Sequence, residues 1–404
     1  MDPLETIRAV ESGAVNTFRL VPDPPVFTGG AGSWLWTADG TRYLDLVCGS
    51  ATTSLGHGHP AHRAAIIAAL DRGILHTGTR LPSTERAQLY DRLSSILPGH
   101  LDTVHLANSG SEAIETALKA AMHATGRNHF VSFEGGYHGR TLGALALTHA
   151  QGLRAPFAPW AKPWTTFCPY ATTRAETPAA LASLHSALDR TPVAAVVIEA
   201  VQGVSGVRAA DPSFLRGVEA AARERGALLI IDEIWSGLGR SGGWFAFDGA
   251  DLSPDLVALG KGLSASLPLS AVAGRHEILK AWSPGAHTST FMGNPLACAA
   301  AVATLDTLRK DNLPDRAAHE IAPALLAGLE GLPGLRVVGA QAAVPLADKT
   351  HATKAQIRAL REERLLVYGG GLEGECILLL PALNILLSDL EDALIRLRPI
   401  LQDP

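Results

Sequence analysis

The 404-residue chain predicts an α/β protein built on a mostly parallel sheet. Strand-length apolar runs at residues 193–198 and 228–231 flank a helix-length stretch at 212–226, which is the rhythm of a βαβ unit. Both runs are apolar at every position, as strands covered on both faces are. Each run ends in an acid, Glu199 or Asp232. Parallel strands bring such acids to one carboxyl edge, where open α/β sheets bind ligands.

Composition narrows the class of protein. With 47% hydrophobic and 18% charged residues, a chain of this length is globular and long enough for two domains. A formal net charge of -5 gives no electrostatic basis for binding nucleic acid. The apolar runs are far shorter than the roughly 20 residues of a membrane-spanning helix, and the first residues do not form a signal peptide. Cys48, Cys168, Cys298 and Cys376 are scattered, so we expect neither disulfides nor a zinc site, and a cytoplasmic location.

The first hundred residues predict an arm, a small hairpin and two helices. Residues 1–30 are rich in proline and turn formers, and 33–36 and 42–46 alternate around the turn at 38–40. Helices are expected at residues 60–70 and 83–97. His57 and His59 lack further ligand types nearby, so we expect no metal there.

A polar turn precedes the next helix. Strand 104–107 runs into Asn108-Ser109-Gly110-Ser111, and a helix is expected over 112–123. Backbone N–H groups and a hydroxyl at a helix N-terminus favour a phosphate. An N-cap formed by Ser111 would explain the same residues, and the two interpretations are compatible.

An aromatic side chain follows the next strand. Strand 130–133 leads into Gly136-Tyr137-His138-Gly139, where Tyr137 could lie flat over a planar ring or pack on its own loop. Residues 150–175, with Trp160 and Trp164, are expected to be irregular and to lie near a substrate entrance.

Lys261 lies between two glycines in an apolar segment. It could be a surface lysine on a turn, or a desolvated amine suited to forming a Schiff base. Beyond it we expect a hydroxyl-rich loop at 287–295, helices at 296–308, 317–329 and 386–397, and strands at 335–338 and 376–380. We therefore divide the chain into an N-terminal arm and small sheet (1–50), a large ligand-binding domain (51–295) and an α+β C-terminal domain (296–404).

One cofactor, pyridoxal 5'-phosphate, would use a lysine, an acid, a phosphate cradle and an aromatic together. The order of these pieces resembles the class III (ω-) aminotransferases, which are fold-type I pyridoxal phosphate enzymes. The resemblance implies a mostly parallel seven-stranded sheet between helices, with a smaller domain built from both chain ends. It rests on six stretches: 108–113, 136–139, 198–203, 231–242, 260–262 and 289–295.

The resemblance also implies roles for individual residues. Lys261 would carry the cofactor as a Schiff base and move the 1,3-proton, and Asp232 would pair with the pyridinium nitrogen. Tyr137 and Ile234 would cover the two ring faces. The family's homodimers share their sites, so Thr290 would reach the phosphate of the neighbouring subunit. The remaining cofactor-binding candidates are Ser109, Gly110, Ser111, His138, Glu199, Gln202 and Ser289.

The departures from the family's pattern concern the substrate. Val204 stands where many members have a glutamate, and Leu378 where they have an arginine that grips a carboxylate. Losing both is consistent, because removing one partner of a buried pair costs roughly 3–5 kcal/mol. Trp235 replaces a frequent glutamine and should narrow the pocket. Arg80 is a substitute carboxylate ligand or an ordinary surface arginine.

We therefore expect an aminotransferase that moves an amino group between an amine or amino-acid donor and a carbonyl acceptor, in a specialised biosynthetic pathway. The alternative is an aminomutase, racemase, epimerase or elimination enzyme with the same cofactor. A catalytically silent protein on this fold would lack the lysine, and Lys261 is present.

Overall fold

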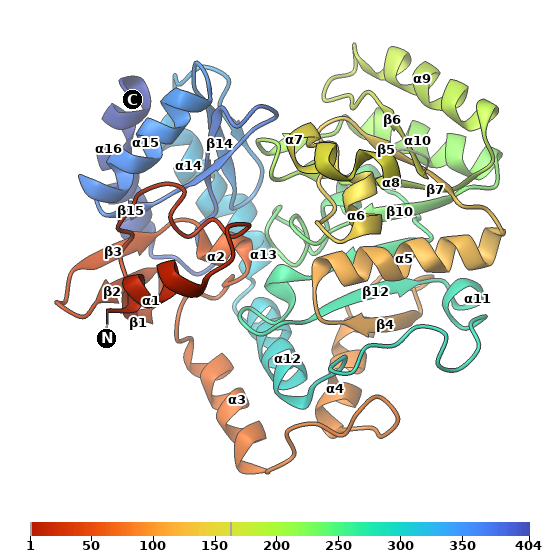
Figure 1. Ribbon diagram of the computed structural model, residues 1–404, viewed down its shortest axis with the longest axis horizontal. Helices are drawn as coiled ribbons and strands as arrows, with labels where there is room; N and C mark the ends of the chain where they lie inside the picture. The colour runs from red at the N-terminus through yellow and green to blue at the C-terminus, as the bar shows by residue number, and fades with distance from the viewer. Residues whose placement is uncertain (1, 162–163) are drawn as a thin grey trace.

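A seven-stranded sheet forms the centre of the molecule, in the order β4-β12-β11-β10-β7-β5-β6 (Figure 1). The computed structural model describes residues 2–161 and 164–404. Four of the neighbouring pairs are parallel, whereas β12 runs antiparallel to both β11 and β4. The predicted mostly parallel sheet is confirmed. Its strands are β4 (Thr103–Ala107), β5 (His129–Phe133), β6 (Thr165–Cys168), β7 (Val193–Ile198), β10 (Leu228–Asp232), β11 (Leu256–Leu259) and β12 (Ser270–Gly274).

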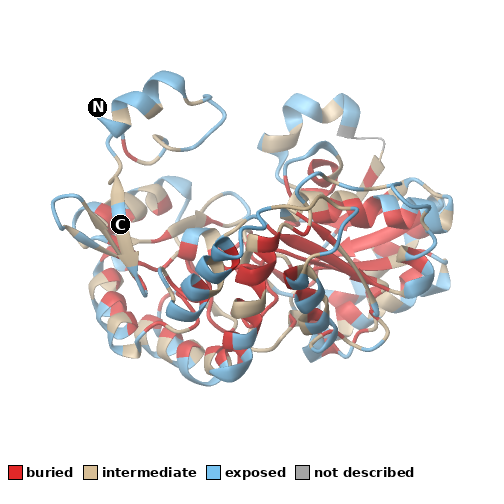
Figure 2. Ribbon diagram, turned by 90° about the horizontal axis from the view of Figure 1, so that it is seen from below, coloured by how far each residue is buried: buried red, intermediate tan, exposed pale blue. Residues whose placement is uncertain are grey.

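The sheet is buried on both faces, which explains its uninterrupted apolar strands (Figure 2). Alternate residues of β10 enter two different apolar clusters: Ile230 joins the side chains of helix α5 (Gly110–Thr125), and Leu229 and Ile231 join those of α10 (Pro212–Glu224). Side chains of a strand alternate between faces. The same alternation puts Asp232 on the α5 side of the sheet.

Several predicted helices pack beside this sheet. Helix α12 contacts both α3 and α4, and α9 packs on α10. Helices α3, α4, α10 and α12 fall where the sequence predicted them, whereas α6, α9 and α11 lie in segments without a helix prediction. Their bounds are α3 (Pro60–Asp71), α4 (Thr84–Ser94), α6 (Leu142–Leu147), α9 (Thr177–Arg190), α11 (His276–Leu279) and α12 (Pro295–Lys310).

The segment expected to be irregular at 150–175 contains two short helices, α7 (Gln151–Arg154) and α8 (Ala158–Ala161), and the edge strand β6. The strand escaped prediction because Thr-Thr-Phe-Cys lacks a long apolar run and pairs on one side only. Trp160 and Trp164 line an apolar groove with Leu118 and Met122 of α5. Neither tryptophan lines the cavity of the candidate site, and the prediction that they lie near its entrance stays a prediction.

Two smaller sheets join the chain ends. In the order β1-β2-β3-β15, strand β15 from the C-terminal part lies parallel to β3 of the N-terminal hairpin. The second sheet has the order β13-β14-β17-β16. The strands are β1 (Phe27–Ala31), β2 (Trp34–Thr37), β3 (Arg42–Asp45), β13 (Arg336–Val337), β14 (Ala342–Pro345), β15 (Leu365–Leu366), β16 (Tyr368–Gly370) and β17 (Cys376–Leu379). The domain boundaries at residues 50 and 295 remain a prediction.

Helices cover these sheets, among them α14 (Ala322–Leu329), α15 (Lys349–Arg361) and α16 (Leu387–Gln402). The sequence predicted one helix over 317–329, but Ala317–Ile321 forms a π-helical turn before α14. Pro323 lacks an N–H, so regular α-helical bonding cannot continue through it. Helix α15 was not predicted; Asp348 caps it by accepting the N–H groups of Thr350 and His351.

The remaining short elements include α1 (Pro3–Val10) in the N-terminal arm, α2 (Cys48–Ala51), α13 (Leu313–Arg316) and a two-stranded sheet of β8 (Val201–Gln202) and β9 (Arg208–Ala209). Helix α1 stands away from the rest of the molecule (Figure 2).

Candidate active site

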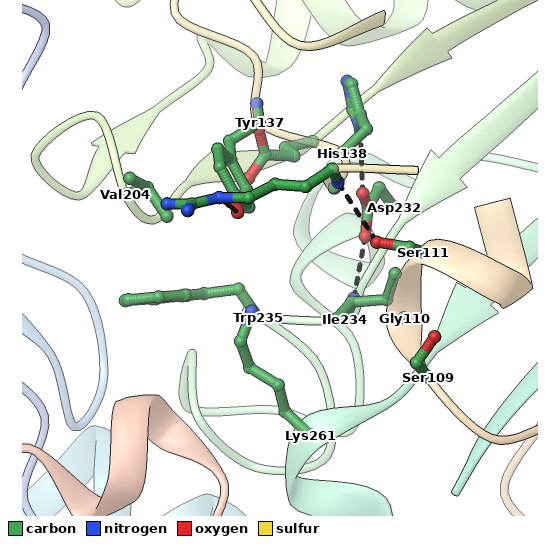
Figure 3. A pocket seen from close by; sticks show the side chains of 13 residues that line it. Ser109, Gly110, Ser111, Tyr137, His138, Val204, Asp232, Ile234, Trp235 and Lys261 are labelled. Atoms are coloured by element: carbon green, nitrogen blue, oxygen red, sulfur yellow. Dashed lines mark hydrogen bonds and ion pairs between the residues drawn. The ribbon is translucent and has the colours of Figure 1, made fainter. Parts of the chain in front are cut away.

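A cavity of about 320 Å³ opens at the carboxyl edge of the central sheet (Figure 3). Four kinds of element bring side chains to it: the ends of strands β7, β10 and β11, the N-terminus of α5, the loop after β5, and the loop that carries Val204. Its lining residues are Ser109, Gly110, Ser111, Tyr137, His138, Gly139, Arg140, Glu199, Val204, Asp232, Ile234, Trp235 and Lys261.

Asp232 and His138 form a buried ion pair at the floor of the cavity. Asp232 Oδ2 lies 2.7 Å from His138 Nδ1, and Oδ1 accepts the N–H of Ile234 at 3.0 Å. Burial by itself lowers the pKa of His138, but the hydrogen bond and charge of Asp232, with Glu199 behind them, outweigh burial and raise it. The pair therefore holds a carboxylate in a fixed position facing the cavity.

Glu199 lies on the same side of the sheet and holds the loop after β5. Its Oε2 accepts the N–H of Tyr137 at 2.9 Å. Burial raises the pKa of Glu199 to about 7, even though His138 opposes the shift. Glu233, which follows Asp232, accepts bonds from Ser236 and Phe247 and does not line the cavity.

Lys261 follows β11 with a positive φ of 41°, a conformation that costs a non-glycine residue about 1 kcal/mol or more. It borders the cavity and so keeps some accessible surface, yet desolvation lowers the pKa of its amine despite the nearby charges of Asp232 and Glu199. Its Nζ lies 4.6 Å from the ring centre of Trp235. The surface interpretation of Lys261 is wrong; it is an amine embedded beside two acids.

The N-terminus of α5 meets the cavity at three residues. Ser109 caps the helix by accepting the N–H of Glu112 at 3.2 Å. The predicted cap at Ser111 is therefore wrong, because Ser111 already lies one residue inside the helix. Its Oγ accepts the backbone N–H of Arg140 instead. A Cβ on Gly110 would come within 2.9 Å of Ile234, so only glycine admits this packing.

Tyr137 lies on the opposite side of the cavity from Trp235 (Figure 3), and Arg140 also lines the cavity. Arg140 Nε donates to the Tyr137 hydroxyl at 3.1 Å. Arg140 was not among the site residues predicted from the sequence. In the sequence, this arginine could have been found as a cationic residue three positions after Tyr137, in the same glycine-flanked loop.

The three positions where the sequence departs from the family's pattern gather at one wall. Val204 and Trp235 line the cavity, and Leu378 lies fully buried in the same apolar cluster. A Cβ on Gly370 would meet both Leu378 and the Val204 carbonyl at 2.5 Å, which shows how closely these two segments approach. Trp235 Nε1 donates to Gln341 Oε1 at 3.0 Å.

Besides Leu378, four predicted site residues lie outside the cavity lining. Gln202 is buried behind the loop, where its amide donates to the Glu134 carbonyl at 2.8 Å. Ser289 accepts a hydrogen bond from Asn108. Thr290 and Arg80 are exposed, and the Thr290 carbonyl bonds His76 at 2.7 Å. The structure thus gives Arg80 no place in the cavity of its own subunit.

The described residues hold no cluster of three or more histidine, cysteine or acidic groups suited to a metal. In the same part of the chain, no helix is both long and apolar enough to cross a bilayer.

The residues around the cavity fit pyridoxal 5'-phosphate, the cofactor that the resemblance implies. A desolvated lysine amine, a fixed carboxylate, an aromatic side chain and a helix N-terminus surround one cavity. These are the groups that a pyridine ring with an aldehyde and a phosphate requires. The close packing of Ile234 on both Gly110 and Gly260 keeps that side of the cavity flat.

Comparison with known proteins identifies the chain. The model of the family "aminotransferase class-III" matches residues 21–401. An acetylornithine aminotransferase of Methanopyrus kandleri is 39% identical over 78% of this chain and 77% of that protein. An ornithine aminotransferase structure from Toxoplasma gondii has a TM-score of 0.87 at 28% identity, covering 100% of this chain and 96% of that one. An (S)-enantioselective omega-transaminase from Thermomicrobium roseum has a TM-score of 0.90 at 27% identity, covering 99% and 97%.

The family match spans residues 21–401 and so includes every stretch that builds the cavity. The predicted fold-type I architecture, the cofactor pyridoxal 5'-phosphate and the aminotransferase activity are confirmed, and the aminomutase, racemase and elimination alternatives are not favoured. The chain belongs to the class III aminotransferase family and is a pyridoxal phosphate-dependent aminotransferase.

Proposed function

We propose that Lys261 and Asp232 are the catalytic residues of this aminotransferase. The observation that carries the proposal is the embedded amine of Lys261 facing the Asp232–His138 pair across a single cavity. When bound, pyridoxal phosphate supplies an electron sink for breaking a C–H bond of the substrate. Lys261 would bond the cofactor and, when released, take the proton from that carbon atom through Nζ. Asp232 would keep the ring nitrogen protonated.

The other cavity residues would bind and orient the cofactor. Ser109, Gly110 and Ser111 present the N-terminus of α5 to the phosphate. Tyr137 and Ile234 would cover the two faces of the ring, and Glu199 would hold Tyr137 in place through its backbone. Gln202 and Ser289 would support cofactor binding indirectly, because each forms a hydrogen bond to a loop that carries cavity-lining residues.

The substrate would be an amine or amino acid whose carboxylate Arg140 binds. Arg140 is the one guanidinium among the described residues that line the cavity. It replaces Arg80 as our candidate, since Arg80 is exposed and outside the lining. Curated relatives carry the name acetylornithine aminotransferase, so N-acetylornithine is the first donor to test.

The enzyme would act as a homodimer in which Thr290 completes the partner's site. Thr290 and Phe291 are exposed in the single subunit, and 63% of the Phe291 surface is accessible. The exposed side chain of Leu75 belongs to a segment that packs beside this loop, since the Leu75 carbonyl accepts a hydrogen bond from Asn294 and His76 bonds the Thr290 carbonyl. A monomer by light scattering would contradict this proposal.

A reducing, cytoplasmic location also remains our proposal. All four cysteines are free and buried. Burial raises the pKa of the thiols of Cys48, Cys298 and Cys376 to about 12, which makes them poor nucleophiles.

The direct test is nitrogen transfer. Purified enzyme with pyridoxal phosphate would be incubated with ¹⁵N-labelled N-acetylornithine or simple amines and a panel of keto acids. We expect label in the product amino acid. Exchange of the substrate's proton without transfer to any acceptor would contradict the function. Arg140→Gln should weaken donors that carry a carboxylate and spare simple amines, whereas the surface control Arg80→Gln should change neither.

A further inference from the structure

The loop that carries Thr290 is anchored on helix α5 by its first residue, His287. The two contacts of His287 on α5, Thr116 and Lys119, lie on the same face of the helix because they are three residues apart. His287 Nε2 lies 3.0 Å from Thr116 Oγ1, and His287 Nδ1 lies 3.0 Å from Lys119 Nζ. Lys119 Nζ also donates to the Ala286 carbonyl at 3.4 Å, which keeps the ammonium beside the imidazole.

The hydrogen bonds of Thr116 fix the tautomer of this imidazole. The Thr116 hydroxyl donates its single proton to the Glu112 carbonyl at 2.8 Å, because a carbonyl can only accept. The hydroxyl oxygen therefore accepts from His287, and the proton of the neutral ring lies on Nε2. Nδ1 then carries the lone pair that accepts from the Lys119 ammonium. His287 bridges both residues only in its neutral form.

The charges around His287 disfavour a second proton on the ring. Burial lowers the pKa of His287 and the charge of Lys119 lowers it further, whereas Glu112 and Glu115 of the same helix act in the opposite direction and are outweighed. Strand β4 presents His105, whose ring centre lies 5.5 Å from that of His287. Burial, together with His287 and Lys119, lowers the pKa of His105 to about 4, so His105 is neutral.

Trp282, on the segment that leads into the loop, covers another side of the imidazole. Its ring meets those of His105 and His287 edge-on, at centre-to-centre distances of 6.2 and 5.8 Å. It also meets the ring of His123 at 6.3 Å. Trp282 shields the imidazole without adding charge. The titratable groups packed around this cluster are those of Glu112, Glu115, Lys119 and His123 on α5 and His105 on β4.

The residues that follow His287 in the loop include two that we assign to the active site. Two positions on, the Ser289 hydroxyl accepts a hydrogen bond from Asn108 in the turn before α5. Three positions on, Thr290 is exposed, and its carbonyl lies 2.7 Å from His76 Nε2. The helix whose N-terminus lines the cavity therefore also determines where this loop begins.

We propose that His287 is a positioning residue that docks this loop on α5 in its neutral form and so orients Thr290 for the cofactor phosphate of the neighbouring subunit. A proton on Nδ1 would face the Lys119 ammonium instead of accepting its hydrogen bond. Acid thus replaces an attraction by a repulsion between like charges and releases the start of the loop. The inference rests on the proposed homodimer and on the role proposed for Thr290 in it.

The test follows cofactor loss from the purified holoenzyme at a series of pH values, read from the absorbance of bound pyridoxal phosphate. In the wild type, loss should become faster as pH falls below the ordinary imidazole pKa of about 6.5. His287→Gln keeps a neutral amide that can donate to Thr116 and accept from Lys119. This variant should retain the cofactor at neutral pH and show a weaker acid dependence.

His287→Leu removes the anchor altogether. At neutral pH it should speed cofactor loss by about two- to tenfold, the fold-change expected for a lost neutral hydrogen bond. In acid it should approach the wild type, whose anchor is then released as well. Unchanged retention in His287→Leu, or equal pH profiles in the wild type and His287→Gln, would overturn the inference.

His123→Gln is the matched control, because His123 lies on the same helix and against the same tryptophan but outside the anchor. It should leave the wild-type pH profile unchanged. Lys119→Gln removes the repulsion that acid creates, so it should weaken the acid dependence. An unaltered dependence in Lys119→Gln would overturn the electrostatic part of the inference.

A second readout does not depend on the cofactor. Imidazole ¹⁵N NMR, with the His287 signals identified by their loss in His287→Gln, should show the proton on Nε2 at neutral pH. Lys119→Gln should raise the pKa of His287, since the neighbouring cation is removed. A proton on Nδ1 at neutral pH would overturn the docking geometry.

Thr290→Val separates this inference from the proposed function on which it rests. Cofactor loss should be faster in Thr290→Val, and adding His287→Leu should then change it little, because both variants remove one contact. Faster loss in Thr290→Val but not in His287→Leu would overturn only the role of His287. No effect of Thr290→Val would instead contradict the proposed shared site.

Discussion

The candidate active site has two walls of opposite character. The polar wall consists of His138, Glu199, Asp232 and Lys261, all buried or embedded and joined by charge. The apolar wall consists of Val204, Trp235, Tyr368 and Leu378, which belong to one apolar cluster. Three residues of the polar wall come from strand ends of one sheet, whereas the apolar wall joins two loops, which carry Val204 and Trp235, to two strands of another sheet.

We infer that the polar wall carries out the reaction and that the apolar wall selects the substrate. A rigid parallel sheet fixes the groups that act on any substrate of the family, since its strand ends cannot move independently. The apolar wall lies where two layers of the molecule meet, so its residues can change without disturbing those strand ends. Substitutions in the two walls should therefore have different kinetic and pH signatures.

The largest effect is expected for Lys261→Ala. The cavity then loses its amine, and kcat should fall by at least about 10⁴-fold, the order seen when a covalent catalyst loses its nucleophile. Borohydride reduction followed by peptide mass analysis should attach the pyridoxyl group to Lys261 in the wild type and leave the variant unlabelled. An active, labelled variant would show that another amine does this work.

Asp232→Asn keeps the shape of the polar wall and removes its charge. We expect kcat to fall by about 10²–10³-fold, as for the loss of one preorganised electrostatic contact. The pKa of His138, read by NMR, should also fall, because Asp232 is what raises it. An unchanged His138 titration would show that Asp232 is not the source of its raised pKa.

Leu378→Arg tests the apolar wall. Leu378 is fully buried, so a lone arginine there should destabilise the fold by about 3–5 kcal/mol in urea unfolding. Adding Val204→Glu on the neighbouring segment should recover part of that loss. A double variant no more stable than the single one would show that the two positions do not face each other.

The dependence of the free energy of unfolding on pH should distinguish the polar wall from the apolar wall. The pKa of Glu199 is raised to about 7 in the folded chain, so folding favours its protonated form. Its contribution is fully present below the usual value near 4.5 and is lost as pH rises to about 7. Glu199→Gln should flatten the curve of unfolding free energy against pH across that window. Trp235 variants should leave its shape unchanged.

Glu233→Gln is the matched control, because burial raises the pKa of Glu233 to about 7 as well. It should flatten the same window but leave cofactor affinity unchanged, since Glu233 does not line the cavity. Loss of cofactor in both variants would contradict the separate roles that we assign to these acids.

The smallest effect is expected for Trp235→Phe. The ring remains beside Lys261, but the hydrogen bond to Gln341 is lost, which should cost about 1 kcal/mol of stability. The kcat with a simple amine should change by less than about tenfold, since a Phe face retains most of the cation–π attraction. A larger loss of kcat would assign Trp235 a direct part in the chemistry.

Much of this protein is determined by its sequence alone. Apolar runs that end at Glu199 and Asp232 predict strands buried on both faces, because only such strands omit polar positions. Fixed local patterns, such as the turn at Ser109-Gly110-Ser111 and the glycines around Lys261, predict the pieces of the active site. These features depend on neighbours in the chain, and a single sequence displays them.

Only the tertiary structure decided how distant residues meet. It brought Arg140 into the cavity and left Arg80 outside it. It also set Arg19 of the arm beside Lys349 of an unpredicted helix, about 330 residues later in the chain. Such contacts depend on which surfaces pack together, and no periodicity within a short segment records that.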